Sequence, residues 1–174
     1  MGIGGLGAYG VQYAKLLGGG ATVVAFGRND EKLALATQNG ADHTINIRGK
    51  SDDQIRDELE QATESRELDA VIECAGAEES MRLAFSLLAT EGAVASVGLV
   101  GNRVDISLFP LVSREYSLFG SFWGNYNDLT EVVALAGAGK IKDSVTPVRF
   151  EEVNDHIEAL GRGDFIGRAV IVYD

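Results

Sequence analysis

The sequence predicts an α/β protein with a doubly wound parallel sheet, and two observations support this prediction. First, short apolar segments rich in β-branched residues alternate with longer segments of helical periodicity. Second, the short segments are apolar on both faces, as strands are when helices cover both sides of a sheet. Strands that alternate with helices pair in parallel through right-handed crossovers. We therefore expect helices to wind around both faces of one sheet.

The elements follow in order from a glycine-rich start. A first helix is expected over residues 8–17 and ends at three glycines, and a second is expected over residues 29–39 with Asn29 as its N-cap. Six strands are expected at residues 21–26, 43–47, 69–74, 93–97, 116–122 and 167–173. Further helices are expected from Ser51 onward and over residues 78–89, 128–138 and 151–160, with a loop through Pro147.

Composition excludes several classes of protein. A chain of 174 residues with 45% hydrophobic residues is long enough for one buried core. The net charge of −11 argues against a nucleic-acid partner and fits either a solvated acidic surface or a protein adapted to high salt. No apolar run could span a membrane and no signal peptide is present, so we expect no membrane partner and a cytoplasmic location.

The residues that most often carry catalysis or bind metals are few. One cysteine, Cys74, and two histidines, His43 and His156, cannot form a Cys/His metal cluster within the chain. We expect both histidines on the surface and Cys74 packed at the end of a strand. Glu73 has the setting of a buried acid with a partner, and no role is assigned to it. The sequence thus predicts neither a catalytic residue nor a metal ligand.

The glycine-rich start has the spacing of a phosphate-binding loop. Gly2, Gly4 and Gly7 fit the pattern G-x-G-x-x-G, with an extra glycine at Gly5. In a Rossmann fold these glycines permit the tight turn, the approach of the pyrophosphate and the close packing of a helix on the sheet. The helix N-terminus then receives the anion. The helix directly after the loop and the strand beyond it favour a dinucleotide site over a structural turn.

A central strand should precede this loop, yet only Met1 comes before Gly2. Without that strand, two neighbouring strands keep unpaired backbone groups, each at a cost of about 1 to 3 kcal/mol. We therefore expect that the first strand is missing and that the chain is a fragment of a longer protein.

The end of the strand expected at residues 21–26, which is the second strand of the fold when the missing one is counted, bears on the choice of nicotinamide cofactor. Gly27 stands where an acidic residue usually binds the ribose of NAD. Arg28 could pair with a 2′-phosphate, and the Asn29 amide could donate to it. This pattern favours NADP over NAD. The alternative is a turn glycine followed by a solvated arginine, with Asp30 reaching back to the ribose.

Ordered blocks along the chain resemble a known family. The blocks are Gly4-Gly5-Leu6-Gly7, Val11-Gln12-Tyr13-Ala14-Lys15, Gly40-Ala41-Asp42, Asp69-Ala70-Val71-Ile72-Glu73-Cys74-Ala75-Gly76, Val97-Gly98-Leu99 and Gly120-Ser121-Phe122-Trp123-Gly124. Together they are similar to the cofactor domain of zinc-dependent medium-chain alcohol dehydrogenases, over nearly the whole chain.

The resemblance implies a parent alcohol dehydrogenase, or aldehyde or ketone reductase, that moves hydride between a small alcohol or carbonyl and NADP(H) or NAD(H). It also implies that a preceding GroES-like domain supplies the catalytic zinc ligands, so the chain alone is expected to be inactive. On this view residues 1–139 form the Rossmann domain, and residues 140–174 form a tail that packs back on the catalytic domain.

The resemblance further implies which residues contact the cofactor. Gly4, Gly5, Leu6 and Gly7 would line the pyrophosphate, Gly27 and Arg28 would face the adenosine ribose, and Ala75, Gly76, Val97, Gly98, Leu99, Phe122 and Trp123 would border the nicotinamide side. Trp123 could instead simply be packed. The family also joins subunits through an edge strand, here from Tyr116 to Phe122, so we expect a homo-oligomer.

Two other interpretations stay open. The chain could be a nucleotide-binding or oligomerisation module without turnover, or part of an enzyme similar to the zinc-free quinone oxidoreductases, which share the fold.

Overall fold

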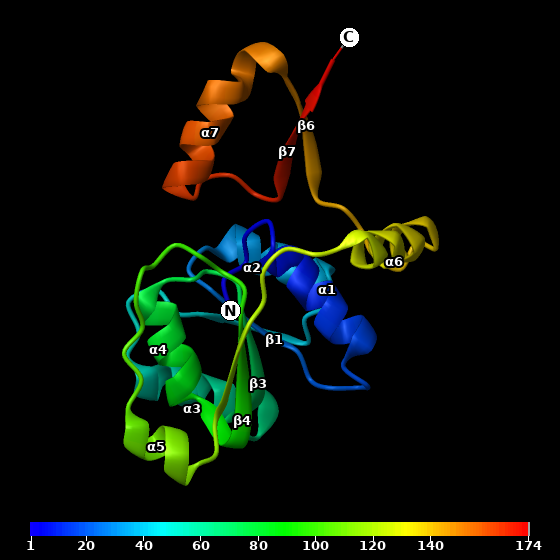
Figure 1. The fold of residues 1–174 in the computed structure, drawn as a ribbon. Helices are drawn as coiled ribbons and strands as arrows, with labels where there is room; N and C mark the ends of the chain where they lie inside the picture. The colour runs from blue at the N-terminus through cyan, green and yellow to red at the C-terminus, as the bar shows by residue number, and fades with distance from the viewer. Residues whose placement is uncertain (174) are drawn as a thin grey trace.

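Helices and parallel strands alternate along the structure, a computed structural model that describes residues 1–173 (Figure 1). The helices are α1 (Gly7–Leu17), α2 (Asp30–Gln38), α3 (Asp52–Thr63), α4 (Glu78–Ser86), α5 (Leu108–Ser113), α6 (Tyr126–Gly137), the 3₁₀ helix η1 (Phe150–Glu152) and α7 (Val153–Arg162). The strands are β1 (Val24–Gly27), β2 (His43–Asn46), β3 (Leu68–Glu73), β4 (Leu88–Ser96), β5 (Ser117–Gly120), β6 (Val145–Arg149) and β7 (Arg168–Val172). The pairings between these strands are parallel, which confirms the predicted α/β class.

Side-chain caps fix where several helices begin. Asn29 Oδ1 accepts a hydrogen bond from Lys32 N at 3.1 Å, so Asn29 caps α2 as predicted. At α3, Ser51 Oγ accepts from Gln54 N while Gln54 Oε1 accepts from Ser51 N, which forms a capping box. These bonds satisfy amides that a helix leaves without partners. α1 differs, because no side chain caps its first turn.

Two elements differ from the prediction between residues 78 and 113. α4 ends at Ser86 rather than at Ala89, because Leu88 pairs with Leu68 and opens β4 earlier than expected. α5 forms where no helix was predicted. Its proline, Pro110, lies in the first turn, where a missing N–H breaks no helical hydrogen bond.

Two strands also differ from the prediction. The loop predicted through Pro147 is instead strand β6, which pairs with β7. A proline is compatible with this two-stranded sheet, because one edge of each strand needs no donor. The strand predicted from Tyr116 to Phe122 is shorter, since β5 covers only Ser117–Gly120.

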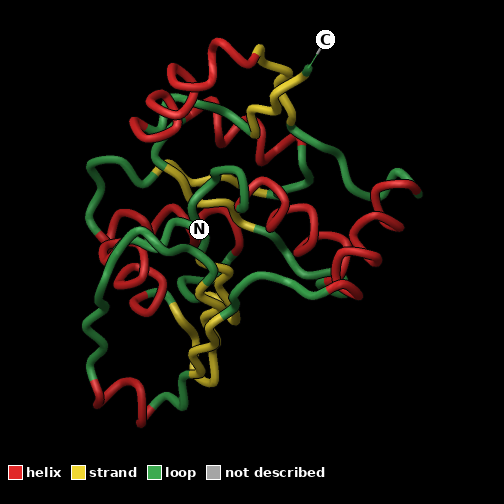
Figure 2. Tube along the Cα trace, turned by 45° about the horizontal axis from the view of Figure 1, so that its top comes forward, coloured by secondary structure: helices red, strands yellow, loops and turns green. Residues whose placement is uncertain are grey.

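The strands form three separate sheets, ordered β1-β2, β3-β4-β5 and β6-β7. Figure 2 shows them as separate yellow groups. Met1 and Gly2 are the link between the first two. Met1 N donates to Ile72 O at 2.6 Å, Cys74 N donates to Met1 O at 2.9 Å, and Gly2 N donates to Phe26 O at 3.0 Å. Met1 and Gly2 thus make the last rungs of a parallel strand between β1 and β3.

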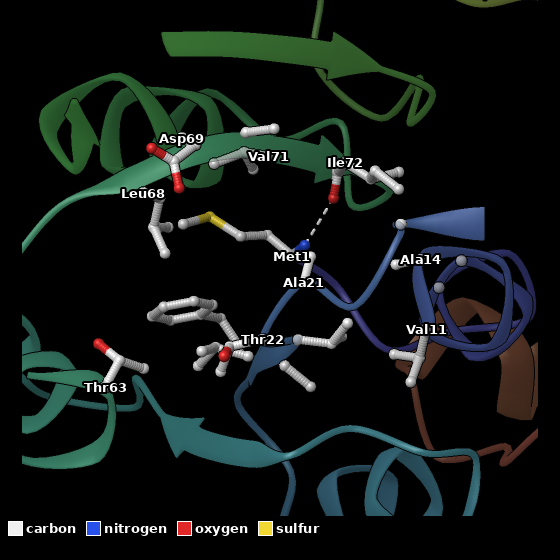
Figure 3. Close-up of a pocket in the computed structure, with 18 of the residues that line it drawn as sticks. Met1, Val11, Ala14, Ala21, Thr22, Thr63, Leu68, Asp69, Val71 and Ile72 are labelled. Carbon is white, nitrogen blue, oxygen red and sulfur yellow. Dashed lines mark hydrogen bonds between the residues drawn. The ribbon is translucent and has the colours of Figure 1, made fainter. Parts of the chain in front are cut away.

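Beside Met1, β1 and β3 lie on either side of a cavity of about 600 Å³. We call this cavity the strand slot. Figure 3 shows Met1 at the slot, with Val71 and Ile72 of β3 on one side, Thr22 on another, and Val11 and Ala14 of α1 nearby. Ile72 is 38% exposed although its strand runs through the middle of the molecule. The structure therefore has no strand at the position where the sequence predicted one to be missing.

Backbone groups on both sides point into the strand slot. In a parallel ladder, successive residues direct their N–H and C=O groups to opposite neighbours. Val23 O and Gly27 O accept bonds from the β2 side, so Val24 and Phe26 direct theirs toward the slot. On β3, Glu73 O accepts from the β4 side whereas Ile72 O accepts from Met1, so Ala70 and Ile72 face the slot.

The core lies in the first two thirds of the chain. One cluster joins α1, β1 and α2, and two others join β1 to β4 with α3 and α4. Met1 packs against both of the latter clusters. By contrast, α5, α6, η1 and α7 bury no residue.

The C-terminal unit, made of β6, α7 and β7, gathers at the top of Figure 1, away from β3 and β4. The segment between α6 and β6 is bonded to α1 through Gln12. Gln12 Nε2 donates to Lys142 O at 2.9 Å, and Lys142 N donates to Gln12 Oε1 at 2.7 Å. Lys32 Nζ also donates to Gly163 O at 2.5 Å. Among residues 1–173, no helix is long and apolar enough to cross a membrane.

Candidate dinucleotide site

The glycine loop packs its backbone directly against the loop after β3. Gly2 has a φ of +82°, and a Cβ placed there would lie 2.6 Å from Ala75 N. A Cβ on Gly7 would collide with the carbonyl oxygen of Gly2. Both positions therefore require glycine, one for its backbone conformation and both for the close approach of two chain segments.

The loop after β3 packs in turn against the loop after β4. A Cβ on Gly76 would collide with the backbone of Gly98 and Leu99, and a Cβ on Gly98 would collide with Gly76. Gly76 has a φ of +66°, and Gly101 N donates to its carbonyl oxygen at 2.6 Å. The three loops that follow Met1, β3 and β4 therefore form one surface. It comprises residues 2–7, 74–77 and 97–101.

This surface includes an open helix start. No heavy atom lies within 4 Å of the position of a Cβ on Gly4. α1 has neither a side-chain cap nor an acidic residue in its first turn, whereas α2, α3 and α4 all begin with acidic residues. Its first amides, from Gly5 and Leu6 to Gly7, are therefore placed to receive an anion. These backbone amides at the start of α1 fit a pyrophosphate.

Sequence reasoning missed one basic side chain at this loop. A Cβ on Gly5 would lie 2.7 Å from Nε of Arg168, so the guanidinium of β7 lies against the glycine loop. The only local signal was a basic residue after Gly167 in the last predicted strand. Neither Arg168 nor Arg28 has an ion-pair partner among residues 1–173.

The four residues at the end of β1 and in the turn after it, residues 27–30, have different environments. Gly27 is buried, and a Cβ on it would lie 3.1 Å from Leu33 Cδ2, so the space beside it is bounded rather than open. Arg28 is exposed, while Asn29 uses its side-chain oxygen to cap α2. Asp30 Oδ1 accepts a hydrogen bond from Asn46 Nδ2 at 2.6 Å. Among the described residues, Arg28 is therefore the one charged side chain of this turn without a polar partner.

The residues after β5 lie beside the loop that follows β4. Ser121 N donates to Ser96 O at 2.9 Å, which brings Phe122 next to the segment that begins at Val97. Trp123 is 86% exposed, has a φ of +57°, and meets Phe122 edge to face at 5.7 Å between ring centroids. Trp123 is therefore not packed against any other part of residues 1–173. Leu99 is exposed as well.

The remaining candidates show no catalytic arrangement. Burial raises the pKa of the half-buried Cys74 thiol, as expected of a packed cysteine. His43 is half-buried, and His156 packs edge to face on Phe165 rather than standing free on the surface. Over residues 1–173, no three His, Cys, Asp or Glu side chains are placed to hold a metal ion. The described residues thus do not fit a catalytic zinc.

Known proteins resemble this chain along almost its full length. A curated NAD-dependent alcohol dehydrogenase of Sulfurisphaera tokodaii is 34% identical over 97% of the chain and 48% of that relative. A D-arabinose 1-dehydrogenase (NADP(+)) of Saccharolobus solfataricus is 34% identical over 98% of the chain and 47% of that relative. The chain therefore spans about half the length of the curated relatives it matches.

Solved structures agree with the sequence relatives. The crystal structure of an alcohol dehydrogenase from Aeropyrum pernix superposes with a TM-score of 0.89 and 33% identity, over 98% of this chain and 48% of that one. The parallel α/β fold is thus the Rossmann-type domain of alcohol dehydrogenases. Residues 5–138 match the zinc-binding dehydrogenase family, and the chain therefore belongs to that family.

Proposed function

We propose that this chain is the cofactor-binding portion of an oxidoreductase that transfers hydride between a small alcohol or carbonyl and a nicotinamide dinucleotide. The observation that carries this proposal is the continuous surface formed by residues 2–7, 74–77 and 97–101, whose glycines let the three loops pack backbone to backbone. The uncapped start of α1 lies within this surface. The dinucleotide supplies the hydride chemistry when bound. The residues of this chain bind and orient it.

We assign the two ends of the dinucleotide to different loops. Gly2, Gly4, Gly5, Leu6 and Gly7 hold the pyrophosphate through backbone amides, and the Arg168 guanidinium adds a positive charge beside them. Ala75, Gly76, Val97, Gly98, Leu99, Phe122 and Trp123 border the nicotinamide end. Substrate activation needs groups that the described residues do not supply, so this chain alone is expected to bind cofactor without turnover.

Binding at the glycine loop can be tested at Gly4, where a new side chain meets no steric obstacle. Gly4→Asp places a negative charge at the pyrophosphate position and should weaken NADPH binding at least about tenfold while leaving the melting temperature unchanged. Gly161→Asp in α7 makes the same change at another open position and should bind NADPH like the unmodified chain. Fluorescence titration measures both. Equal affinities for the two variants would contradict the proposed site.

We further propose that Arg28 selects NADP, with Gly27 and Asn29 forming the rest of the turn. Arg28 is exposed and has no acidic partner among the described residues, which leaves it free for a 2′-phosphate. Arg28→Ala should weaken NADPH binding about tenfold and leave NADH binding unchanged, and Arg66→Ala in the loop between α3 and β3 is the control. Gly27→Asp is a less direct test, because its side chain would press on Leu33. An unchanged ratio of affinities in Arg28→Ala would assign selectivity elsewhere.

The edge strand β5 is the proposed contact between subunits. Its outer edge has no pairing partner within residues 1–173, and Leu118 and Phe119 are 43% and 59% exposed. Such an edge is a template for pairing with a second copy. Phe119→Lys should shift the chain toward the monomer in sedimentation, and an unchanged mass would place the interface on another surface.

A further inference from the structure

Glu73, the last residue of β3, is a fully buried charged residue that the proposed cofactor contacts do not use. Its carboxylate accepts hydrogen bonds from the backbone of the residues that follow it in the chain. Ala75 N donates to Oε1 at 3.0 Å, and Gly76 N donates to Oε2 at 2.7 Å. Both oxygens therefore hold the turn that follows the strand.

The backbone of Glu73 holds a second loop. Val97 N donates to Glu73 O at 2.8 Å, and Gly98 N donates to the same oxygen at 3.0 Å. One residue thus accepts four N–H bonds, two from the loop after β3 and two from the loop after β4. These two loops are also the pair whose glycines, Gly76 and Gly98, touch backbone to backbone.

The chemistry of these bonds calls for a carboxylate. Two backbone N–H groups need two acceptors, and an ionised Glu offers acceptors at both oxygens and no donor. A Gln of the same size would turn an NH₂ group toward one of the two N–H groups. A hydrogen bond to a charged group is also stronger than one between neutral groups. Glu73 therefore holds Gly76 in its positive-φ conformation more firmly than its amide analogue could.

We propose that Glu73 is a positioning residue that fixes the loops after β3 and β4 in the conformation that receives the nicotinamide end of the cofactor. This inference rests on the proposed function for its ligand, whereas the fixing of the loops does not depend on any ligand. Among residues 1–173, the glycine loop that receives the pyrophosphate donates no hydrogen bond to Glu73. We therefore expect the adenosine end of the cofactor to depend less on the Glu73 carboxylate than the nicotinamide end does.

The test compares Glu73→Gln with the unmodified chain by two measurements. Amide hydrogen exchange at Ala75 and Gly76 should accelerate at least about tenfold, because an N–H bond to a charged acceptor is lost. NADPH binding should weaken about tenfold, while binding of 2′-phospho-ADP-ribose, which lacks nicotinamide, should stay within about twofold. Glu73→Asp keeps the charge and both acceptors on a shorter side chain and should recover part of both effects. Glu79→Gln, on the exposed start of α4, is the matched control and should change neither.

Each outcome decides whether Glu73 positions the two loops or has only a general structural role. Unchanged exchange at Ala75 and Gly76 overturns the proposal. Equal loss of both ligands also overturns it, because a merely structural role would weaken the whole site. If the unmodified chain binds neither ligand, the proposed function fails, while the exchange data still decide whether Glu73 fixes the loops. If Glu73→Gln does not fold, Glu73→Asp must show accelerated exchange confined to the two loops, and the absence of that acceleration overturns the proposal.

Discussion

The first 97 residues and the residues from 108 onward form helices with similar local signals but pack them very differently. α3 and α6 are both twelve residues long, and both begin with a capping box, from Ser51 and from Asn125. α3 buries Ile55 and Leu59, whereas α6 buries no residue and leaves Leu129 60% exposed. Capping and propensity are therefore enough to start and end a helix, while burial depends on what the rest of the chain places against it.

The same comparison applies within the sheet. β3 has a paired edge toward β4 and an open edge toward the strand slot, and within residues 1–173 only Met1 bonds to the open edge. Successive side chains of a strand lie on opposite faces of the sheet, and Val71 is buried on one face of β3 whereas Ile72 on the other face is 38% exposed. Beside the strand slot, β3 therefore lacks backbone pairing along one edge and full burial of Ile72 on one face.

Filling the strand slot should have the largest effect on stability. Five apolar, β-branched residues joined to Met1 would pair with Val24, Ala70 and the N–H groups of Phe26 and Ile72. At about 1 kcal/mol for each bond, with further gain from apolar burial, we expect the melting temperature to rise by 10 °C or more. Circular dichroism melts check this. A Gly-Ser extension of equal length is the control, and equal melting temperatures for the two would contradict the assignment of the slot.

A matched pair of leucines should separate the packed region from the unpacked one. Leu59→Ala in α3 removes a fully buried side chain and should cost about 3 kcal/mol of unfolding free energy. Leu129→Ala in α6 makes the same change on an exposed face and should stay within about 0.5 kcal/mol. Urea unfolding measures both. A large loss at Leu129 would show that α6 is covered in solution, for example by a second copy.

Loss of the Gln12 amide should loosen the C-terminal unit without unfolding the core. Gln12→Ala removes both hydrogen bonds to Lys142, so amide exchange at Lys142 should accelerate about tenfold. Protease cleavage near residues 139–144 should accelerate with it. Gln61→Ala on the exposed face of α3 is the control. Unchanged exchange at Lys142 would mean that other contacts hold this unit.

The smallest effect should be a pH dependence that originates at Met1. Burial lowers the pKa of the Met1 amino group below its ordinary value of 8.0, although Cys74 and Glu73 act in the opposite direction. The unfolded chain then binds the proton more tightly than the folded one. Stability should accordingly rise with pH between the lowered pKa and 8.0.

Urea midpoints measured from pH 6 to pH 8.5 check this dependence. The chain extended through the strand slot is the control, because a peptide amide replaces the amino group. An equally steep rise in the extended chain would assign the effect to another titrating group.

The sequence was most informative where structure follows from local patterns. Strands β1 to β5, the cap at Asn29 and the start of a helix at Ser51 followed from apolar runs and local helix signals, and the glycine spacing predicted the loop before α1. Pro147 was misleading, because proline is disfavoured in strands in general but not at an unpaired edge.

Contacts between distant segments could not be read from the sequence. Arg168 reaches the glycine loop from the far end of the chain, and Gln12 meets Lys142 across 130 residues. For Trp123 two alternatives were open, a position beside the nicotinamide and simple packing, and the sequence around it did not predict that it is 86% exposed. In each case the deciding factor is which segments the fold brings together.

The contact made by Gln12 has a consequence for how the C-terminal unit can vary. Gln12 bonds to the backbone N–H and C=O of Lys142, as a neighbouring strand would, and neither bond involves the lysine side chain. Any residue other than proline could stand at position 142 and keep the same two bonds. This contact of the C-terminal unit thus depends on a residue of α1 that lies more than a hundred positions upstream. The residue type at position 142 can vary without loss of the two hydrogen bonds.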